Sequence, residues 1–333
     1  MTQQDAVSLP TDYTVRAALD QDPQDILRLM EACYEDFGLA WGGYTEVDVR
    51  DGWAHLDMQR DTWCILSPDG ALAAYAELTS QGSGTLRADG YVHPAHRGKG
   101  VGTAIVRLME ARGRELASEA PAGSEVSLLN GVMLGDQAGR DLLERAGYSV
   151  VRVFWEMRIE LSEEPATPSL PAGLRLRGFI PGQDDHAVYE TNEAAFADHW
   201  EHAPRTFEEW HEGMERPDFD PTLWLLVEAE DGTIPAILRS WMRSNHGYIS
   251  TVATLRAWRG QGLASALLRA SFRAYWQRGV HVVALHVDAQ NPTGATRVYE
   301  AAGMHTSASA VIYKKSLRPG DNVATEQTDP TQA

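Results

Sequence analysis

The chain has little cysteine and no cluster of metal-ligating residues. Its 333 residues include two cysteines, Cys33 and Cys64, and neither belongs to a Cys-x-x-Cys pair or a Cys/His group with metal-ligand spacing. These absences argue against a disulfide scaffold and against a metal site. We expect both thiols to be buried as small apolar side chains.

Positive charge is also scarce. The sequence has 29 Lys+Arg against 47 Asp+Glu, a formal net charge of -18. An acidic field of this size repels nucleic acid and anionic lipid, so neither is an expected partner. The same field would attract a cationic acceptor such as an amine, although acidic surfaces more often serve solubility.

Long apolar runs and common phosphate-binding loops are missing as well. No run is long enough to cross a membrane, and the opening MTQQDAVSLPTDYT has neither a basic region nor an apolar one. We therefore expect a cytoplasmic protein. The P-loop GxxxxGK[ST] is absent, and no GxGxxG follows a strand with an acidic residue about 20 positions later.

What the sequence does contain is a near-repeat at half its length. HRGKGVGTAIV (96–106) and WRGQGLASALL (258–268) share their glycine spacing, and a length prior of about 150 residues per domain favours two domains. The stretch 162–173, SEEPATPSLPAG, reads as a linker. We therefore predict folded units at 13–161 and 174–317, with a disordered tail at 318–333.

Both halves show the same coarse order of elements: a helix-rich start, a hairpin, a strand, the glycine segment with its helix, a strand, a short helix and a last strand. In the second half the hairpin spans 222–242 and the next strand 247–255. A helix with Leu263, Leu267, Ala270 and Ala274 on one stripe ends at Gly279, before a strand at 281–289. A strand, helix and strand in succession form a βαβ crossover. The prediction is an α/β (α+β) fold, a mixed central sheet flanked by helices, present twice.

The glycine segments are suited to bind an anion. A helix N-terminus offers unpaired N–H groups and a positive dipole, and glycine lets the anion approach the backbone. One such copy could be only a glycine-rich turn, but two copies in the same context favour pyrophosphate binding. The predicted ligands are Arg97, Gly98, Lys99, Gly100, Val101 and Gly102 in the first half, and Arg259, Gly260, Gln261, Gly262, Leu263 and Ala264 in the second.

VHPAHRGKGVG and TLRAWRGQGLA resemble the acyl-CoA-binding signature of the GNAT acyltransferase superfamily, Arg/Gln-x-x-Gly-x-Gly/Ala after a strand ending in Val-x-Pro. The first copy has Val92 and Pro94 in register, whereas the second has Thr254 and Arg256 there. The resemblance covers nearly the whole chain. It implies two tandem GNAT domains, acetyl-CoA (coenzyme A) as cofactor, and backbone N–H groups near Val252 and Thr254 that polarise the thioester carbonyl.

A later stretch, VDAQNPTGATRVYEAAGM (287–304), resembles the superfamily segment in which a strand ends at Asn and a helix carries Tyr before a glycine. Here Asn291 is the predicted N-cap and a cofactor contact, Pro292 the first helical residue, and Gly303 a left-handed stop. An isolated tyrosine at helical spacing is usually core. The resemblance implies instead that Tyr299 protonates the departing coenzyme A thiolate.

The first half has no tyrosine at the matching position. In MLGDQAGRDLLERAGY, Leu143 stands four residues before Gly147, and leucine cannot donate a proton. The resemblance to tandem GNAT enzymes of the mycothiol synthase type implies that the amino-terminal domain binds acyl-CoA or supports the structure, with the chemistry in the carboxy-terminal domain.

The sequence leaves the general base and the acceptor open. Candidate bases are His246, Tyr248, Glu228, His199 and His202. AFADHWEHAPRTFEEW (195–210) is the predicted acceptor wall, although Trp200 and Phe207 could equally pin a loop to the core.

We expect direct acetyl transfer to the primary amine of a small molecule, such as an antibiotic, an amino sugar or a cysteinyl pseudodisaccharide. The alternatives are a non-catalytic acyl-CoA-binding sensor and a protein N-acetyltransferase. The expected assembly is a monomer that acts as its own pseudo-dimer, or a homodimer.

Overall fold

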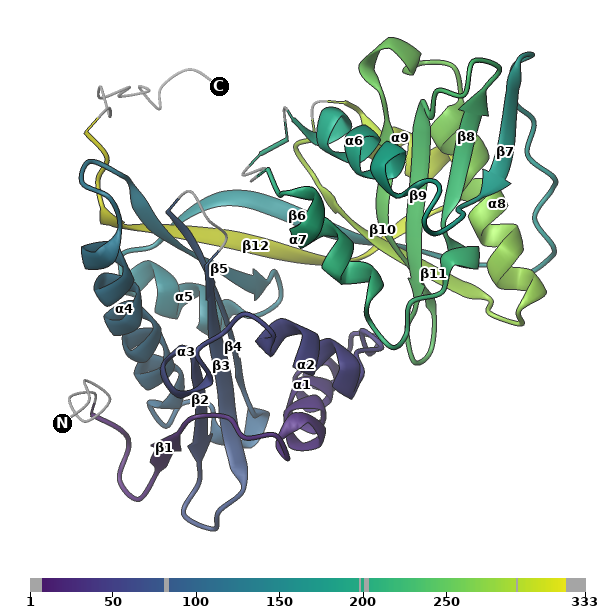
Figure 1. Ribbon diagram of the computed structural model, residues 1–333. Coiled ribbons are helices and arrows are strands. Elements are labelled where there is room, and N and C mark those ends of the chain that lie inside the picture. The colour runs from purple at the N-terminus through teal and green to yellow at the C-terminus, as the bar shows by residue number, and fades with distance from the viewer. Residues whose placement is uncertain (1–7, 81–83, 198, 201–203, 292, 322–333) are drawn as a thin grey trace, which may run out of the picture. The chain divides into compact units, whose positions relative to one another are not determined.

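The computed structural model describes residues 8–80, 84–197, 199–200, 204–291 and 293–321, which form two compact units (Figure 1). The first unit takes the described residues up to Gly38, Gly52–Val151 and those from Val311 on. The second takes Leu39–Asp51 and Arg152–Ala310. Each unit is a mixed sheet flanked by helices, as predicted.

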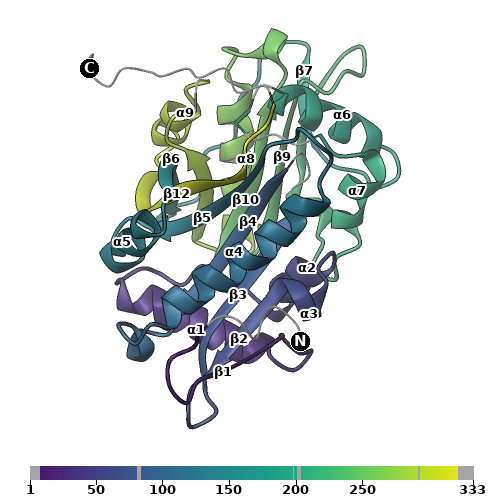
Figure 2. The same ribbon diagram turned by 90° about the vertical axis from the view of Figure 1, so that its left-hand side faces the viewer.

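In the first unit, α4 crosses one face of strands β3, β4 and β5, and α1 lies on the other face (Figure 2). The strand order is β1-β2-β3-β4-β5-β12. The elements of the first half of the chain are β1 (Thr14–Arg16), α1 (Pro23–Asp36), α2 (Glu46–Trp53), α3 (Met58–Asp61), β2 (Thr62–Leu66), β3 (Leu72–Ser80), β4 (Thr85–Val92), the 3-10 turn Pro94–His96, α4 (Val101–Glu119), β5 (Val126–Met133), α5 (Gln137–Arg145) and β6 (Ser149–Glu160).

The second unit has the corresponding order β6-β11-β10-β9-β8-β7. The elements of the second half of the chain are β7 (Leu174–Gly178), α6 (Asp185–Phe196), α7 (Phe207–His211), the 3-10 turns Glu212–Met214, Pro221–Leu223 and Arg256–Trp258, β8 (Leu225–Ala229), β9 (Ala236–Met242), β10 (Gly247–Thr254), α8 (Leu263–Gln277), β11 (Val282–Asp288), α9 (Ala295–Ala301) and β12 (His305–Arg318). Residues 161–173 form neither helix nor strand.

The compact units differ from the predicted halves because each half contributes its last strand to the other unit. β6, from the first half, pairs with β11 from Val282↔Glu160 to Asp288↔Phe154. From Val311 on, β12 belongs to the first unit, where the Tyr313 hydroxyl donates to Glu144 at 2.9 Å. Sequence alternation shows that a strand is half-buried, but it does not show which sheet the strand joins.

Helix α8 follows from its sequence pattern. Leu263 and Leu267 are buried, as predicted, and burial of each such side chain contributes about 1.5–3 kcal/mol. The helix ends where predicted: Gly279 has φ +75°, and the N–H of Val280 donates to the Tyr275 carbonyl at 3.0 Å.

Both cysteines are buried and free, as predicted. Their thiols are not purely apolar, because Cys33 donates to the Val92 carbonyl at 3.3 Å and Cys64 to the Asp22 carboxylate at 3.7 Å. Burial raises the pKa of Cys33 to about 11 and that of Cys64 to about 12, so both stay protonated at neutral pH. Over the part of the chain that the structure describes, no helix is both long and apolar enough to cross a bilayer.

A segment from the first half of the sequence, residues 39–51, belongs to the second unit and packs against the turn between β9 and β10. The Gly43 carbonyl accepts from the Ser244 N–H at 3.0 Å. Gly43 has φ +69°, and a Cβ there would lie 2.6 Å from the Asn245 Oδ1 and 2.8 Å from the Arg243 Cβ. Only glycine allows this close approach.

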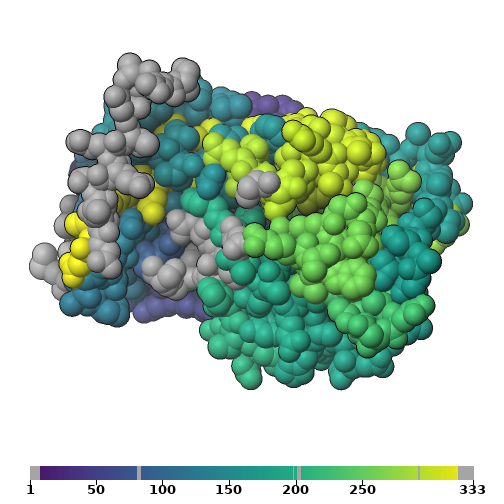
Figure 3. Space-filling view, turned by 90° about the horizontal axis from the view of Figure 1, so that it is seen from above, coloured from purple at the N-terminus to yellow at the C-terminus, as the bar shows by residue number. Residues whose placement is uncertain are grey.

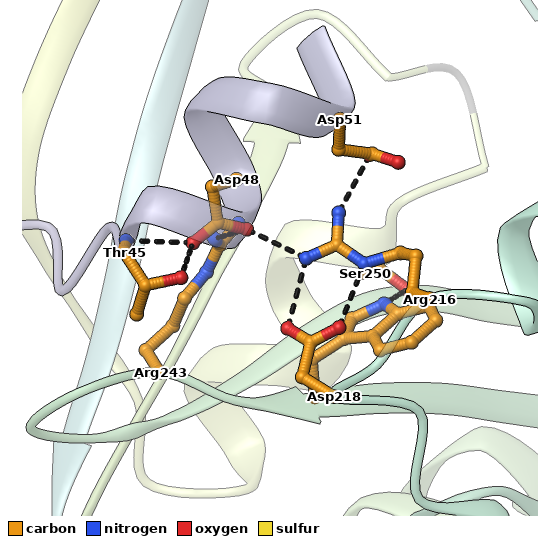
Figure 4. A network of polar contacts seen from close by, with 8 residues as sticks. Thr45, Asp48, Asp51, Arg216, Asp218, Arg243 and Ser250 are labelled. Atoms are coloured by element: carbon orange, nitrogen blue, oxygen red, sulfur yellow. Dashed lines mark hydrogen bonds and ion pairs between the residues drawn. The ribbon is translucent and has the colours of Figure 1, made fainter. Parts of the chain in front are cut away.

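Asp48 on α2 anchors the same segment (Figure 4). Its carboxylate pairs with Arg243 and lies 2.9 Å from the Arg216 Nη2, while Arg216 also contacts Asp51 at 2.6 Å and Asp218 at 2.9 Å. Burial opposes ionisation of Asp48, but Arg243, Arg216 and the Thr45 N–H outweigh it and keep its pKa below the usual range. The ionised carboxylate therefore stabilises the fold above the unfolded-state pKa of about 4, and this contribution is lost as pH falls through the folded-state value.

We expect Asp48→Asn to lower the free energy of unfolding by about 2 kcal/mol at neutral pH, because it leaves two mostly buried arginines short of an anion. Denaturant unfolding followed by tryptophan fluorescence measures the loss, which should shrink as pH falls from 7 towards 3. Asp51→Asn is the matched control: Asp51 is 48% exposed and shares Arg216, so the control should cost at most about 0.5 kcal/mol. Equal losses for the two variants, or a loss independent of pH, would contradict the assignment.

Candidate active site

The glycine segment before α8 leaves open space at the start of the helix. Gly260 and Gly262 have φ of +78° and +79°, and a Cβ added to either would meet no described atom within 4 Å. Helix α8 begins at Leu263 and has no acidic residue in its first turn. Helix α8, which follows this segment, contacts α9, and the light green and yellow surfaces of this part of the chain adjoin in Figure 3.

Backbone donors face this space. Among the described residues, no carbonyl accepts the N–H groups of 260–264, and the first helical bond runs from the Ala266 N–H to the Gly262 carbonyl at 3.0 Å. Unpaired donors, the helix dipole and glycines without side chains together fit a diphosphate. Gln261 is exposed in the middle of the segment.

The first unit repeats this arrangement, with Gly98 at φ +74° and Gly100 at φ +86° before α4. A Cβ at Gly98 would meet nothing described within 4 Å, and one at Gly100 would lie 3.6 Å from the Pro10 Cγ. Lys99 is exposed, and Val101 is buried as the first helical residue.

The two arginines of the repeat have different environments. Arg97 pairs with the Asp36 carboxylate and lies over the Phe37 ring, 4.7 Å from its centroid. Arg259 contacts only backbone carbonyls, Thr254 and Ala195, each at 3.3 Å. No carboxylate pairs with Arg259 within the described ranges, so its charge is left for a ligand, whereas that of Arg97 is partly neutralised.

Strands β10 and β11 part at the level of the glycine segment. Their parallel pairing runs from Gly247↔Val283 to Ile249↔Leu285 and ends there, although β10 continues to Thr254. The Leu255 N–H donates to the Pro235 carbonyl at 2.9 Å. By antiparallel alternation, the N–H groups of Val252 and Thr254 then point away from β9, towards the side that β11 has left. Among the described strands, none pairs with this side of β10 beyond Ile249, so the N–H groups predicted to polarise a carbonyl face the opening.

A β-bulge occurs beside this parting in the second unit. The β9–β10 register shifts between Ile249 and Thr251, whereas β3 and β4 pair regularly from Ala74↔Val92 to Ser80↔Leu86. In the first unit the last parallel pair is Ala88↔Asn130. The spacing from Ala88 to His93, whose N–H donates to the Ala73 carbonyl, is one residue shorter than the spacing from Ile249 to Leu255, whose N–H makes the matching bond. A bulge re-aims the strand next to it. The first unit also parts its strands but lacks this feature.

Tyr299 and Leu143 occupy equivalent positions in the two halves. Gly303 has φ +94°, and the Met304 N–H donates to the Tyr299 carbonyl at 3.0 Å. In α5 the Tyr148 N–H donates to the Leu143 carbonyl, also at 3.0 Å, across a second left-handed glycine. Both helices therefore end in the same Schellman motif, and the predicted alignment of tyrosine with leucine holds.

The Tyr299 hydroxyl holds its proton firmly. The residue is 8% exposed, and burial raises its pKa to about 12. Within the part of the chain that the structure describes, the hydroxyl has no hydrogen-bond partner. A buried, protonated phenol with an unused donor is suited to give a proton to a ligand.

Asn291 does not cap α9, contrary to prediction. Its Oδ1 accepts the Thr293 N–H at 2.9 Å and the Thr293 hydroxyl at 2.6 Å. The residue before the helix is Gly294, at φ +72°. The physical reason is that an Asn side chain can satisfy a nearby turn instead of a helix end. Pro292, predicted at the first helical position, lies outside the described residues.

Two of the predicted general bases are already engaged. The Glu228 carboxylate pairs with Arg175 and Arg177, and hydrogen bonds from these two arginines hold its pKa below the usual range. His246 is 4% exposed, and its Nδ1 lies 2.6 Å from the Asn245 Oδ1. Burial, with help from nearby arginines, lowers the pKa of His246 to about 4.

The predicted acceptor wall is only partly described, and His202 lies outside the described residues. The His199 Nδ1 is 3.2 Å from the Trp200 carbonyl. Phe207 stacks on His186 with centroids 3.8 Å apart, so it joins α7 to α6. Trp200 lies beneath the Arg152 guanidinium at 5.2 Å.

The structure adds two residues that the sequence reasoning missed, His286 and Glu156. The Tyr248 hydroxyl is 3.0 Å from the His286 Nδ1, and the His286 Nε2 is 3.8 Å from the Glu156 Oε2. Within HVVALHVDA, His286 alternates with buried residues, which could have indicated an outward-facing polar side chain. No local signal points to Glu156, because it comes from the last strand of the first half.

Comparison with known proteins agrees with this geometry. The model of the Acetyltransferase (GNAT) family matches residues 24–148 and again 186–304. A mycothiol acetyltransferase of Kineococcus radiotolerans is 36% identical over 75% of this chain and 80% of its own length. A mycothiol acetyltransferase of Stackebrandtia nassauensis is 30% identical over 88% of this chain and 95% of its own length.

Solved structures give the same result. A GCN5-related N-acetyltransferase from Sphaerobacter thermophilus is 37% identical, with a TM-score of 0.83 over 94% of this chain and 98% of that one. A tandem GNAT protein from the clavulanic acid biosynthesis pathway shares the fold, with a TM-score of 0.70 and 17% identity over 93% of this chain and 100% of that one. The chain belongs to the GNAT acetyltransferase family and is an acetyl-CoA-dependent N-acetyltransferase with two GNAT domains in tandem.

Proposed function

We propose that the second unit transfers the acetyl group of acetyl-CoA to the primary amine of a small molecule, and that Tyr299 returns a proton to the coenzyme A sulfur. The observation that carries this proposal is the contrast between Tyr299 and Leu143 at equivalent positions. The names of the mycothiol acetyltransferase relatives support a small acceptor. They make the amine precursor of mycothiol the first acceptor to test.

Acetyl-CoA supplies an acetyl group activated as a thioester. Gly260, Gly262 and the first N–H groups of α8 would hold its diphosphate, with Arg259 adding charge. The N–H groups of Val252 and Thr254 would donate to the thioester oxygen, where negative charge grows during attack. The Asn291 Oδ1 is used within its turn, so the predicted contact of Asn291 with the cofactor would have to come from its Nδ2 group.

The environment of Tyr299 keeps its proton in place until the reaction. The apolar surroundings that raise its pKa to about 12 would also raise the pKa of a coenzyme A thiol beside it, so a thiolate formed there would take up a proton more readily than in water. The Tyr299 Oη would donate its proton to the sulfur as the carbon–sulfur bond breaks, and the tyrosinate would regain a proton before the next turnover. At neutral pH the phenol is fully protonated beforehand, so no separate charging step is needed.

The first unit is proposed to bind acyl-CoA or to support the structure without turnover. It keeps the glycine segment and the parting of β4 from β5, but Leu143 replaces the proton donor and the bulge is missing. Arg97 is moreover paired with Asp36. The first two differences each remove a contribution to chemistry, and the pairing of Arg97 reduces the charge available to a diphosphate, while the glycines and the helix N-terminus that would hold it remain.

The glycine segments give the first test of the site. Replacing Gly262 by Glu should abolish measurable coenzyme A binding to the second unit and turnover, because it puts bulk and negative charge where the diphosphate lies. Isothermal calorimetry should show up to two sites in the wild type and only the first in this variant. Gly262→Ala is the matched control. It introduces the same strain of a left-handed backbone, about 1 kcal/mol, but it adds no negative charge.

The counterpart Gly100→Glu should remove the first site and leave turnover nearly intact. Turnover that survives Gly262→Glu, or is abolished by Gly100→Glu alone, would move the working cofactor to the other unit.

Tyr299→Phe tests the proton donor. It keeps the ring packing, so the thermal midpoint should stay close to wild type, whereas kcat should fall about 10²–10⁴-fold. Coenzyme A affinity should change little, because the proton matters only as the thiolate forms.

Leu143→Ala is the matched change in the first unit. It should cost about 2–5 kcal/mol of stability through a cavity and leave kcat nearly unchanged. A wild-type rate for Tyr299→Phe, together with loss of activity in Arg97→Ala, would show that the chemistry belongs to the first unit.

A further inference from the structure

We propose that Tyr248, His286 and Glu156 form a relay that takes up the proton released by the acceptor ammonium. This inference rests on the proposed function. An amine acceptor reaches the enzyme mostly as an ammonium, which has no lone pair for attack, so some group must receive its proton.

The relay lies where the second unit opens. Tyr248 lies in the part of β10 that pairs with β11. His286 is the first residue of β11 beyond the final pair of these two strands, Ile249↔Leu285. Glu156 on β6 stands directly opposite His286 in the β11–β6 register. Three neighbouring strands thus bring a phenol, an imidazole and a carboxylate to the edge of the opening that contains the Val252 and Thr254 donors.

The contacts order these groups in one direction. The Tyr248 hydroxyl lies 3.0 Å from the His286 Nδ1; if the phenol donates, Nδ1 accepts and the imidazole proton is on Nε2. Nε2 faces the Glu156 Oε2 at 3.8 Å, and the Ser307 hydroxyl donates to the Glu156 Oε1 at 2.7 Å. The Glu156 side chain is 10% exposed and that of His286 is 41% exposed. A fixed carboxylate therefore stands behind an accessible imidazole.

Burial and the surrounding charges set the resting protonation of His286 and Tyr248. Burial lowers the pKa of His286 below its usual range, Arg243 acts in the same direction and Glu156 opposes them, so the ring is neutral at pH 7. Burial raises the pKa of Tyr248, with Tyr44 and Glu156 adding to the rise and Arg243 opposing it.

Two arginines face the relay. The Arg243 guanidinium lies 5.0 Å above the Tyr248 ring and is itself paired with Asp48. The Arg158 Nε is 3.6 Å from the Glu156 Oε1. While His286 is neutral, Arg158 therefore balances the charge of the Glu156 carboxylate at Oε1. The other oxygen, Oε2, can still stabilise an imidazolium at His286.

The step conserves protons and electrons. The ammonium N–H bond breaks and its proton passes to the Tyr248 Oη, while the phenolic proton moves to the His286 Nδ1. The resulting imidazolium is stabilised by Glu156, and the freed lone pair on nitrogen forms the new carbon–nitrogen bond. The nitrogen then loses its second proton, which balances the proton that Tyr299 gives to the departing sulfur. The exposed ring of His286 then releases the proton to water. Tyr248 meets the acceptor, whereas Glu156 acts through His286 as a positioning residue.

The experiment compares two classes of acceptor. Alkylamines are protonated at neutral pH and need a base, whereas a hydrazide of similar size is neutral and does not. In His286→Gln and Tyr248→Phe, kcat/KM should fall about 10²-fold or more for the alkylamine and less than about threefold for the hydrazide. His305→Gln is the matched control. His305 also lies 3.8 Å from a carboxylate, Glu160, but both side chains are 59% exposed, and neither acceptor should respond.

A second readout does not require turnover. Nuclear magnetic resonance of ¹³C-labelled histidine, assigned with the His286→Gln spectrum, should show that Glu156→Gln lowers the pKa of His286, because the variant removes the carboxylate that favours the charged ring. An unchanged titration would overturn the relay. So would equal losses with both acceptors in His286→Gln, since a merely structural role does not distinguish them. A wild-type enzyme that acetylates no amine would instead refute the proposed function.

Discussion

The parting of β10 from β11 after Ile249↔Leu285 is the constraint on which the second unit depends. Parallel strands that stop pairing leave backbone N–H groups without partners, and such groups are costly unless a ligand or water takes them. The β10 side of this opening carries the donors of Val252 and Thr254. It then continues into the glycine segment and the N-terminus of α8. The same backbone that weakens the sheet is therefore what we propose binds the cofactor.

The opening is held in shape by residues from distant parts of the sequence. Residues 39–51, which precede the first sheet in the chain, pair Asp48 with the arginine that lies over Tyr248. β6, the last strand of the first half, supplies Glu156 behind His286. The second half of the sequence alone would lack both contributions. The duplication has thus produced two units that are each completed by segments of the other half, which explains why a cut at the linker does not correspond to a boundary between compact bodies.

Features of the fold and of the site that depend on residues close together in sequence could be predicted. Glycines before a helix, the left-handed stop at Gly303 and the loss of the tyrosine at Leu143 are all readable from spacing, because each depends on neighbours within a few residues. The prediction that Asn291 caps the helix was wrong for a reason that is also local. Its side chain bonds within the turn of its own loop and does not reach the helix end. Glu228 looked like a free base because its arginines come from β7, 51 and 53 residues away in sequence. Cross-strand partners of this kind leave no trace in a local pattern.

The asymmetry between the units is the basis of the proposed separation between cofactor binding and catalysis. Both units keep left-handed glycines, a helix N-terminus without acidic residues and strands that part. Only the second has the extra residue that shifts the β10 register, and only the second has a phenol at the end of its short helix. A diphosphate is recognised by charge and backbone shape, which tolerate the loss of either feature. In the proposed mechanism, moving a proton to a departing thiolate depends on one hydroxyl at one place, so a single change to leucine would be enough to separate binding from chemistry.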